Sequence, residues 1–136
     1  MLLEFRDIQI EDISFFENYW KITSQRASDY SFPILWGWAG DYGYQTARED
    51  DEDLLWIRQT VPRDYDLAPL GQWKRDDWAE IIQKRFGKEA EFWLVPEKLL
   101  DLWKFQFGEK LDAQDMRGSW EYLYDIRDLA MLPGNR

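Results

Sequence analysis

Short runs of alternating apolar and polar residues recur along the first half of the chain, with stretches of helical spacing between them. The alternation predicts strands over Leu2–Ile8, Tyr44–Glu49, Leu54–Thr60 and Tyr65–Ala68. The acidic segment Glu49–Asp53 joins the second of these strands to the third, which indicates a hairpin with a charged tip.

The helical stretches of this half begin at residues that favour a helix start. One helix follows Glu11 and Asp12, and its apolar face comprises Ile13, Phe16, Tyr19, Trp20 and Ile22. A short second helix is expected after Ser28–Pro33, where several N-cap residues precede a proline suited to a first turn. It extends past Trp38 toward the glycines that begin at Gly40.

The second half predicts two better-delimited helices around a strand at Ala90–Val95. The first helix ends at Gly87, and its apolar stripe is Trp78, Ile81, Ile82 and Phe86. Pro96 and Gly108 bound the second helix, whose apolar stripe is Leu99, Leu100, Trp103 and Phe107.

The tail adds a strand at Ser119–Asp125, a short helix at Ile126–Leu132 and a turn at Pro133–Arg136. A strand needs a neighbour, and no later segment offers one. We therefore expect the chain to be the front part of a longer protein, with self-association through an unpaired strand edge when this part is alone.

Strands that alternate with helices predict an α+β (α/β layered) fold rather than a helical bundle or a sandwich. With 136 residues, of which 45% are hydrophobic, the chain suits one core, so residues 1–136 are expected to form a single domain. The nine Trp are expected mainly in that core.

Composition excludes several kinds of chemistry. The chain has no Cys and no His, which removes thiol nucleophiles, the usual neutral-pH proton carrier and the commonest zinc ligands, so no metal site is expected. The net charge of −10 disfavours nucleic acid and anionic membrane surfaces. Because no leader or membrane-spanning apolar run is present, a soluble cytoplasmic protein is expected.

The strongest candidate for a ligand cradle is the turn predicted at Pro69–Gly71, before the helix that contains Trp78. Backbone N–H groups at a helix start can bind a phosphate, so Leu70, Gly71 and Gln72 are candidate cofactor-binding residues. One glycine is also compatible with an ordinary strand-to-helix turn. The acidic run lacks the ligand spacing of a calcium loop and is interpreted as a solvated hairpin tip.

Two aromatic groups are candidates for a cleft or a partner surface. Trp36 and Trp38 cannot point the same way on a short helix, so we expect one in the core and one on a second surface, although both could be buried. Tyr122, Tyr124 and Asp125 could exchange protons in a cleft, or simply pack on a strand. No catalytic residue is assigned.

The predicted element order resembles the first part of the GNAT fold of N-acetyltransferases, a mixed, mainly antiparallel sheet of about six strands with helices on both faces. The segments that carry a closer resemblance are Ser28–Phe32, Leu35–Trp38, Pro69–Gly71, Tyr122–Asp125 and Leu129–Arg136. They look like the front part of an uncharacterised bacterial family related to the C-terminal domain of phosphatidylglycerol lysyltransferases.

The resemblance implies two acetyltransferase-like halves in tandem, with this chain as the N-terminal one. Transfer chemistry, with acyl-CoA or aminoacyl-tRNA as donor, would then belong largely to the second half. Acetyltransferases usually place Gln or Arg, two residues, Gly, one residue and Gly or Ala before the third helix. This chain has Leu67–Trp73 there, and Pro69 supplies no N–H, so we expect no tight CoA binding and no cofactor in this half.

Three functions follow as hypotheses. The first is a non-catalytic GNAT-like half of an acyl- or aminoacyltransferase, with Gly71, Tyr122 and Tyr124 nearest a shared cleft. The second is a stand-alone protein-interaction module with exposed tryptophans. The third is a small complete N-acetyltransferase.

Overall fold

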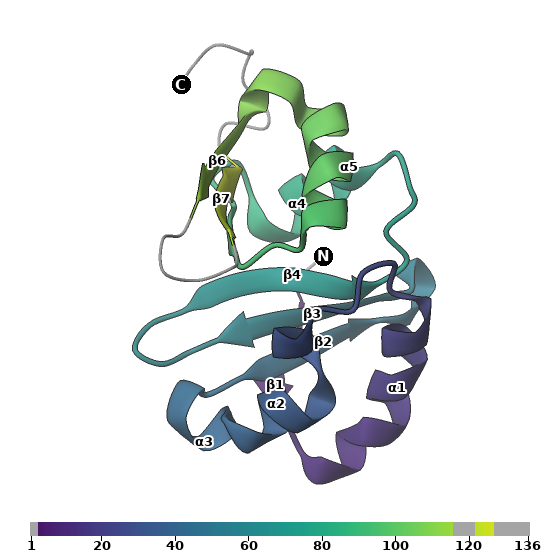
Figure 1. Cartoon of the computed structure of the whole chain (residues 1–136), viewed down its shortest axis with the longest axis vertical. Helices are drawn as coiled ribbons and strands as arrows, with labels where there is room; N and C mark the ends of the chain where they lie inside the picture. Colours follow the sequence, from purple (N-terminus) through teal and green to yellow (C-terminus); the bar gives the residue numbers. More distant parts are fainter. Residues whose placement is uncertain (1–2, 116–121, 127–136) are drawn as a thin grey trace. The chain divides into compact units, whose positions relative to one another are not determined.

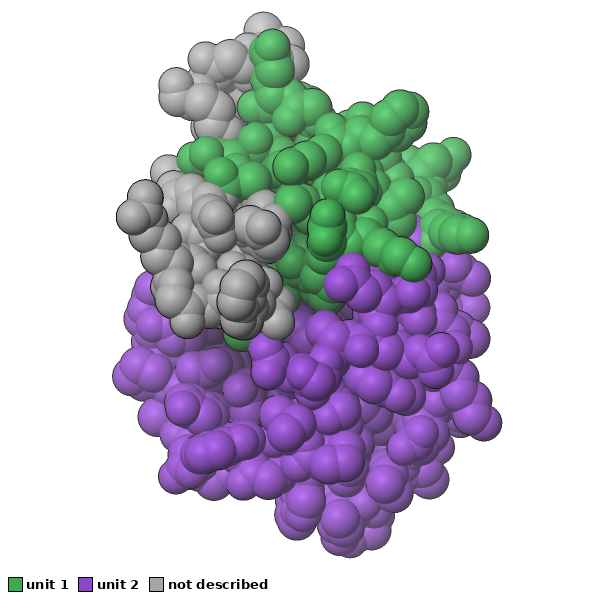
Figure 2. Space-filling model, viewed as in Figure 1, with its two compact units in different colours: residues 1–2, 74–136 green, residues 3–73 purple. Residues whose placement is uncertain are grey.

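The chain forms two compact units in a computed structural model that describes residues 3–115 and 122–126 (Figure 1). Unit 2 comprises Leu3–Trp73 and unit 1 contains the residues from Lys74 onward (Figure 2). Each unit combines antiparallel strands with helices, so the predicted α+β class is confirmed. The prediction that residues 1–136 form a single domain stays a prediction.

The sheet of unit 2 has the order β1-β2-β3-β4, with every neighbouring pair antiparallel. Its strands are β1 (Arg6–Asp7), β2 (Gln45–Glu49), β3 (Leu54–Gln59) and β4 (Tyr65–Gly71). The predicted hairpin is present as β2 and β3, with Ala47 opposite Trp56. β1 is much shorter than the alternation at its position predicts.

β4 continues through the residues that the sequence assigned to a turn. Leu55 pairs with Leu70 and Ile57 with Leu67, so β4 has one residue more than β3 between these pairs, which is a β-bulge. A bulge tolerates proline because the local ladder is already interrupted. The predicted break at Pro69 is therefore wrong.

Side chains satisfy the backbone groups that the bulge leaves out of the ladder. The Ala68 N–H donates to the Tyr30 hydroxyl at 3.0 Å, and the Pro69 carbonyl accepts from the Trp73 indole at 2.9 Å. Tyr30 and Trp73 are both buried. Since an unpaired buried backbone group is costly, these bonds stabilise the bulge.

The helices of unit 2 are short and precede the hairpin in sequence. They are α1 (Ile13–Ile22), α2 (Phe32–Gly37) and α3 (Ala39–Tyr42) (Figure 1). α1 lies against β3 and β4, and it buries Phe16 and Tyr19. Ile13 and Ile22, which the sequence placed on the buried face, are 41% and 45% exposed.

The hairpin tip, a 3-10 turn at Asp50–Glu52, is only partly solvated. Asp50, Asp51 and Asp53 are exposed as predicted, but Glu49 is buried and accepts a hydrogen bond from the Trp56 indole at 2.6 Å. The Tyr19 hydroxyl donates to Asp50. Burial, and next the hydrogen bond to Asp50, raise the pKa of Tyr19 to about 12.

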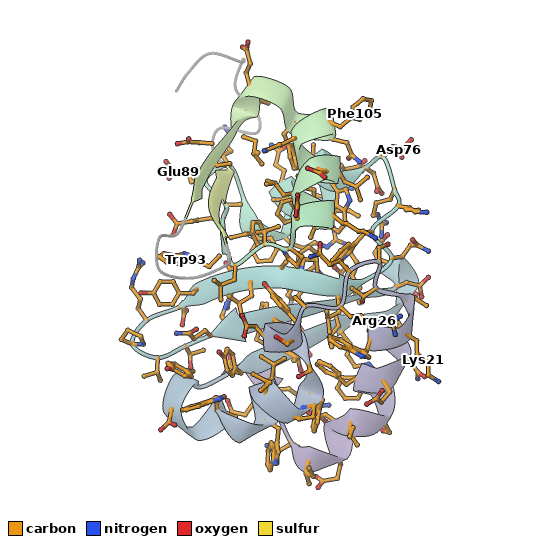
Figure 3. The ribbon with its side chains drawn as sticks, in the orientation of Figure 1. Lys21, Arg26, Asp76, Glu89, Trp93 and Phe105 are labelled. Atoms are coloured by element: carbon orange, nitrogen blue, oxygen red, sulfur yellow. The ribbon has the colours of Figure 1, made fainter. Side chains whose placement is uncertain are left out.

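Unit 1 has the strand order β5-β7-β6, again antiparallel. Its elements are α4 (Trp78–Phe86), β5 (Glu91–Trp93), α5 (Glu97–Phe107), β6 (Leu111–Asp115) and β7 (Tyr122–Ile126). The buried ring of Trp103 lies 5.6 Å from that of Trp78 and 5.2 Å from that of Phe92, centroid to centroid. Phe105 points outward from α5 (Figure 3) and is 90% exposed.

The end of the chain differs from its prediction in one respect. β7 covers part of the predicted strand, but it pairs on one side with β5 and on the other with β6, both earlier in the sequence. β6 was not predicted from the sequence. The strand therefore does not lack a neighbour. The predicted helix after Ile126 and the turn at Pro133–Arg136 lie outside the described residues.

Candidate functional site

A pocket of about 300 Å³ lies in unit 2, where the end of β1 meets α2, α3 and the start of β2. It combines aromatic rings, glycines and one carboxylate. The lining residues are Asp7, Ile8, Gln9, Trp36, Ala39, Gly40, Gly43 and Tyr44. This mixture of apolar surface and a few polar groups is typical of small-ligand sites.

Hydrogen bonds fix the wall of the pocket that follows β1. The Ile8 N–H donates to the Tyr44 carbonyl at 3.3 Å, and the Gln9 N–H donates to Asp12 Oδ2 at 2.9 Å. The Asp7 carboxylate accepts from the Gln45 side-chain amide at 3.0 Å. The backbone of this wall is therefore held at both sides of Ile8, which is itself buried.

Glycines shape the opposite wall. Gly43 ends α3 at φ 59°, its N–H donates to the Ala39 carbonyl at 2.8 Å, and its own carbonyl accepts from Thr60 Oγ1 at 2.7 Å. A Cβ on Gly43 would lie 2.2 Å from Thr60 Oγ1, so only glycine fits this approach. A Cβ on Gly40 would meet nothing within 4 Å, which leaves the pocket open on that side.

Three ring contacts position the aromatic walls. The Trp36 ring stacks on that of buried Phe32, with centroids 6.5 Å apart and planes 8° from parallel. The Tyr44 ring lies 5.9 Å from that of Tyr42, which in turn lies 5.8 Å from Trp38. Packing of this kind limits the rotamers of the lining rings.

Trp36 and Trp38 are 40% and 49% exposed. The expectation that one of them enters the core is therefore wrong, and so is its alternative that both are buried. The buried residues of α2 are Phe32 and Leu35, which lie one turn apart on one face. Trp36 and Trp38 follow on either side of Gly37 and remain at the surface.

The electrostatic environment of the pocket is negative. Among the described lining residues, Asp7 carries the only formal charge. Burial raises the pKa of Tyr44, and the negative charge of Asp29 raises it further. The phenol of Tyr44 is consequently neutral at pH 7.

The N–H groups of Gly71 and Gln72, two of the predicted cofactor-binding residues, donate to other atoms of the protein. The Gly71 N–H donates to Thr23 Oγ1 at 2.9 Å, and the Gln72 N–H donates to the Asp53 carbonyl at 2.9 Å. Leu70 is buried and pairs with Leu55 in the sheet. A ligand at this place would have to displace hydrogen bonds that the fold already makes.

Gly71 is required by the fold rather than by a ligand. Its φ is 127°, and a Cβ would lie 2.0 Å from the Asp53 carbonyl oxygen. The glycine lets β4 approach the hairpin tip closely enough for the bond between Gln72 and Asp53.

The tail candidates lie in β7 of unit 1. Tyr124 is opposite Phe92 of β5 and Ala113 of β6, and Asp125 is opposite Glu91 and Asp112. Tyr122 is opposite Asp115. Gly71 belongs to unit 2, so its proximity to these tyrosines in a shared cleft stays a prediction.

The sequence indicated Trp36 but missed Asp7, Gly40 and Tyr44 as neighbours of one pocket. Their assembly depends on the pairing of β1 with β2, where Arg6 is opposite Thr46. In the sequence, the glycines that follow an aromatic-rich helix were the signal that could have indicated this pocket. Within the described ranges, 3–115 and 122–126, no group of acidic residues is arranged to hold a metal ion.

No helix in the described part of the chain combines the length and apolar character needed to cross a bilayer.

Comparison with known proteins gives a likeness in fold alone. No family model matches the sequence, and a search of curated proteins gives no match. A crystal structure of a conserved protein of unknown function from Bacteroides thetaiotaomicron is similar, with a TM-score of 0.64 and 18% sequence identity. The match covers 85% of this chain and 40% of the other, so this chain spans less than half the length of that protein.

Proposed function

We propose that the chain is the non-catalytic, GNAT-like half of a larger cytoplasmic acyl- or aminoacyltransferase. A second GNAT-like half would supply the donor site, for acyl-CoA or aminoacyl-tRNA, and the reacting groups. The α+β fold and its similarity to 40% of a longer protein support this proposal. Its main support is the end of β4, where the N–H groups of Gly71 and Gln72 already have acceptors.

Both geometry and charge disfavour a pyrophosphate at the end of β4. A pyrophosphate is held by several N–H donors that point into one cradle. Here Pro69 has no N–H, and the bonds of Gly71 and Gln72 are directed into unit 2. The net charge of −10 adds repulsion toward an anionic donor. Binding of CoA or tRNA by this half alone should therefore be weak.

Calorimetric titration of the isolated chain with acetyl-CoA tests the donor assignment. We expect no saturable heat up to about 1 mM ligand, which corresponds to less than about 4 kcal/mol of binding free energy. A CoA-binding acetyltransferase titrated in the same buffer is the control. Micromolar binding would contradict the proposal and favour a small complete N-acetyltransferase.

The tandem arrangement has a separate test. The gene should continue past Arg136 into a second α/β segment, and the longer product should show transfer activity that the present chain lacks. A stop codon directly after Arg136 would contradict it.

A second candidate function is a protein-interaction module, because Trp36 and Trp38 are exposed. Size-exclusion chromatography together with tryptophan quenching separates it from the first proposal. A finished module should remain monodisperse, whereas a half without its partner should self-associate through the surface that the partner half would cover.

A further inference from the structure

We propose that the pocket of unit 2 binds a small organic cation of the trimethylammonium type, in contact with the rings of Trp36 and Tyr44 and with Asp7 as counter-charge. This site is independent of the transferase proposal, because none of the pocket residues belongs to β4 or to unit 1.

Aromatic faces attract cations because the ring quadrupole is negative above its plane, and tryptophan is the strongest of the aromatic side chains in this respect. The pocket provides Trp36 from α2 and Tyr44 from the segment between α3 and β2. Asp7 adds a formal negative charge, and no Lys or Arg is among the described lining residues. The pocket therefore favours a positive ligand over a neutral or negative one.

The environment of Tyr44 independently indicates negative potential. Besides burial, the carboxylate of Asp29 raises the pKa of Tyr44, because negative charge at the phenol is disfavoured beside it. The same potential stabilises a positive group placed beside the ring. The overall charge of −10 would also attract cations to this surface at low salt.

A methylated ammonium suits the lining better than a primary one. A primary ammonium brings three N–H donors, each of which needs an acceptor when it leaves water. The Asp7 carboxylate accepts one hydrogen bond from Gln45, and the Tyr44 carbonyl accepts one from Ile8, so part of the acceptor capacity at the pocket is already used. A trimethylammonium group has no N–H and needs only apolar and aromatic contact together with a counter-charge.

The volume of the pocket and the rigidity of its walls also suit a small ligand. Its volume of about 300 Å³ is at the lower end of small-molecule sites. Gly40 contributes no side chain to it, and the stacking of Trp36 on Phe32 holds one wall in place before binding. Little conformational entropy is then lost on binding.

The experiment compares choline with the neutral isostere in which a tert-butyl group replaces the trimethylammonium group. Both are titrated into the intact chain and followed by tryptophan fluorescence and by NMR. We expect saturable choline binding that is about tenfold tighter than binding of the isostere, the ratio expected of a cation–π contact. Equal affinities, or no saturation by choline at about 50 mM, would overturn the proposal.

Substitutions at two glycines then locate the site. Gly40→Leu adds a side chain at a glycine that lines the pocket, whereas Gly37→Leu adds the same side chain at a helical glycine that does not line it. A Cβ meets nothing within 4 Å at either position, so both variants should fold. We expect Gly40→Leu to abolish choline binding and Gly37→Leu to preserve it. Binding that survives Gly40→Leu would place the ligand elsewhere.

A second pair tests the aromatic contact. Trp36→Ala should weaken choline binding about tenfold, while Phe105→Ala, which removes an exposed ring of unit 1, should leave it unchanged. Asp7→Asn should weaken binding a few-fold and reduce its dependence on salt. Equal losses in the Trp36 and Phe105 variants would contradict a site at Trp36.

Discussion

Unit 1 and unit 2 are stabilised in different ways. The core of unit 1 is built around Trp103, whose ring contacts those of Trp78, Phe92 and Phe107. Unit 2 also buries an apolar core, which includes Phe16 and Leu35, but its bulged strand is held in addition by hydrogen bonds between residues far apart in the chain, such as Tyr30 with Ala68 and Thr23 with Gly71. Apolar packing follows local periodicity, whereas these polar contacts do not. A sequence pattern can therefore predict apolar packing, but it cannot predict these hydrogen bonds.

Removal of the central ring of unit 1 should have the largest effect. Trp103→Ala should lower the free energy of unfolding by about 3–5 kcal/mol, because it leaves a cavity among three aromatic rings. Urea unfolding followed by circular dichroism measures this loss.

Trp103→Phe is the matched control. The indole N–H of Trp103 is buried without a hydrogen-bond partner among the described residues, so phenylalanine forfeits packing but no hydrogen bond. It should cost clearly less than alanine. Equal losses would mean that the indole N–H has an important partner.

Glycine substitutions should differ sharply between the units. Gly71→Ala should cost about 3 kcal/mol, because its Cβ would lie 2.0 Å from the Asp53 carbonyl oxygen and its φ is 127°. Gly87→Ala in unit 1 also has positive φ, 83°, but its Cβ meets nothing within 4 Å. It should cost only about 1 kcal/mol. Thermal unfolding of both variants checks this order.

Loss of the Thr23 hydroxyl should have a smaller effect. Thr23→Val keeps the side-chain shape but removes the acceptor of the Gly71 N–H and the donor to the Tyr19 carbonyl. The expected cost is about 2 kcal/mol, since a buried N–H is left unsatisfied. Thr23→Ser keeps the hydroxyl and should recover most of that loss in the same denaturation assay. Similar costs for the two variants would show that the methyl group matters more than the hydrogen bonds.

The pH dependence of unit 2 should show the smallest effect. The pKa of Tyr19 is raised from 10.0 to about 12 in the folded chain, so the folded state retains a proton that the unfolded state loses. Its contribution to stability is complete below pH 10.0 and is lost as the pH rises toward about 12. Tyr19→Phe should remove this component. The difference between wild-type and variant stability, measured by urea unfolding at about pH 9 and about pH 11, tests it.

Lowering the pH should act on the partner of Tyr19. The hydrogen bond from Tyr19 is the main cause that lowers the pKa of Asp50. The stability contributed by ionised Asp50 is therefore present at neutral pH and is lost as the pH falls through the lowered pKa. Asp50→Asn should reduce this loss of stability at acidic pH. An unchanged loss would show that other carboxylates cause most of it.

Much of the fold could be read from the sequence because the signals were local. Pro96 and Gly108 bound α5 as expected, and the residues of its predicted apolar stripe are all buried. The β2–β3 hairpin follows from two alternating runs around an acidic turn. Of the candidate pocket, only Trp36 was identified beforehand.

What the sequence determined by itself was the type and approximate extent of elements whose apolar spacing matches a helix or strand period. Only the tertiary structure decided that β4 continues through Pro69, that Trp36 and Trp38 both stay at the surface, and that β7 lies between two earlier strands. The physical reason is that the spacing of apolar residues along the chain indicates only which side chains can lie on the same face of a helix or strand. Which face is buried, and which backbone groups find partners, depends on residues distant in the chain, as the contact of Tyr30 with the Ala68 bulge illustrates.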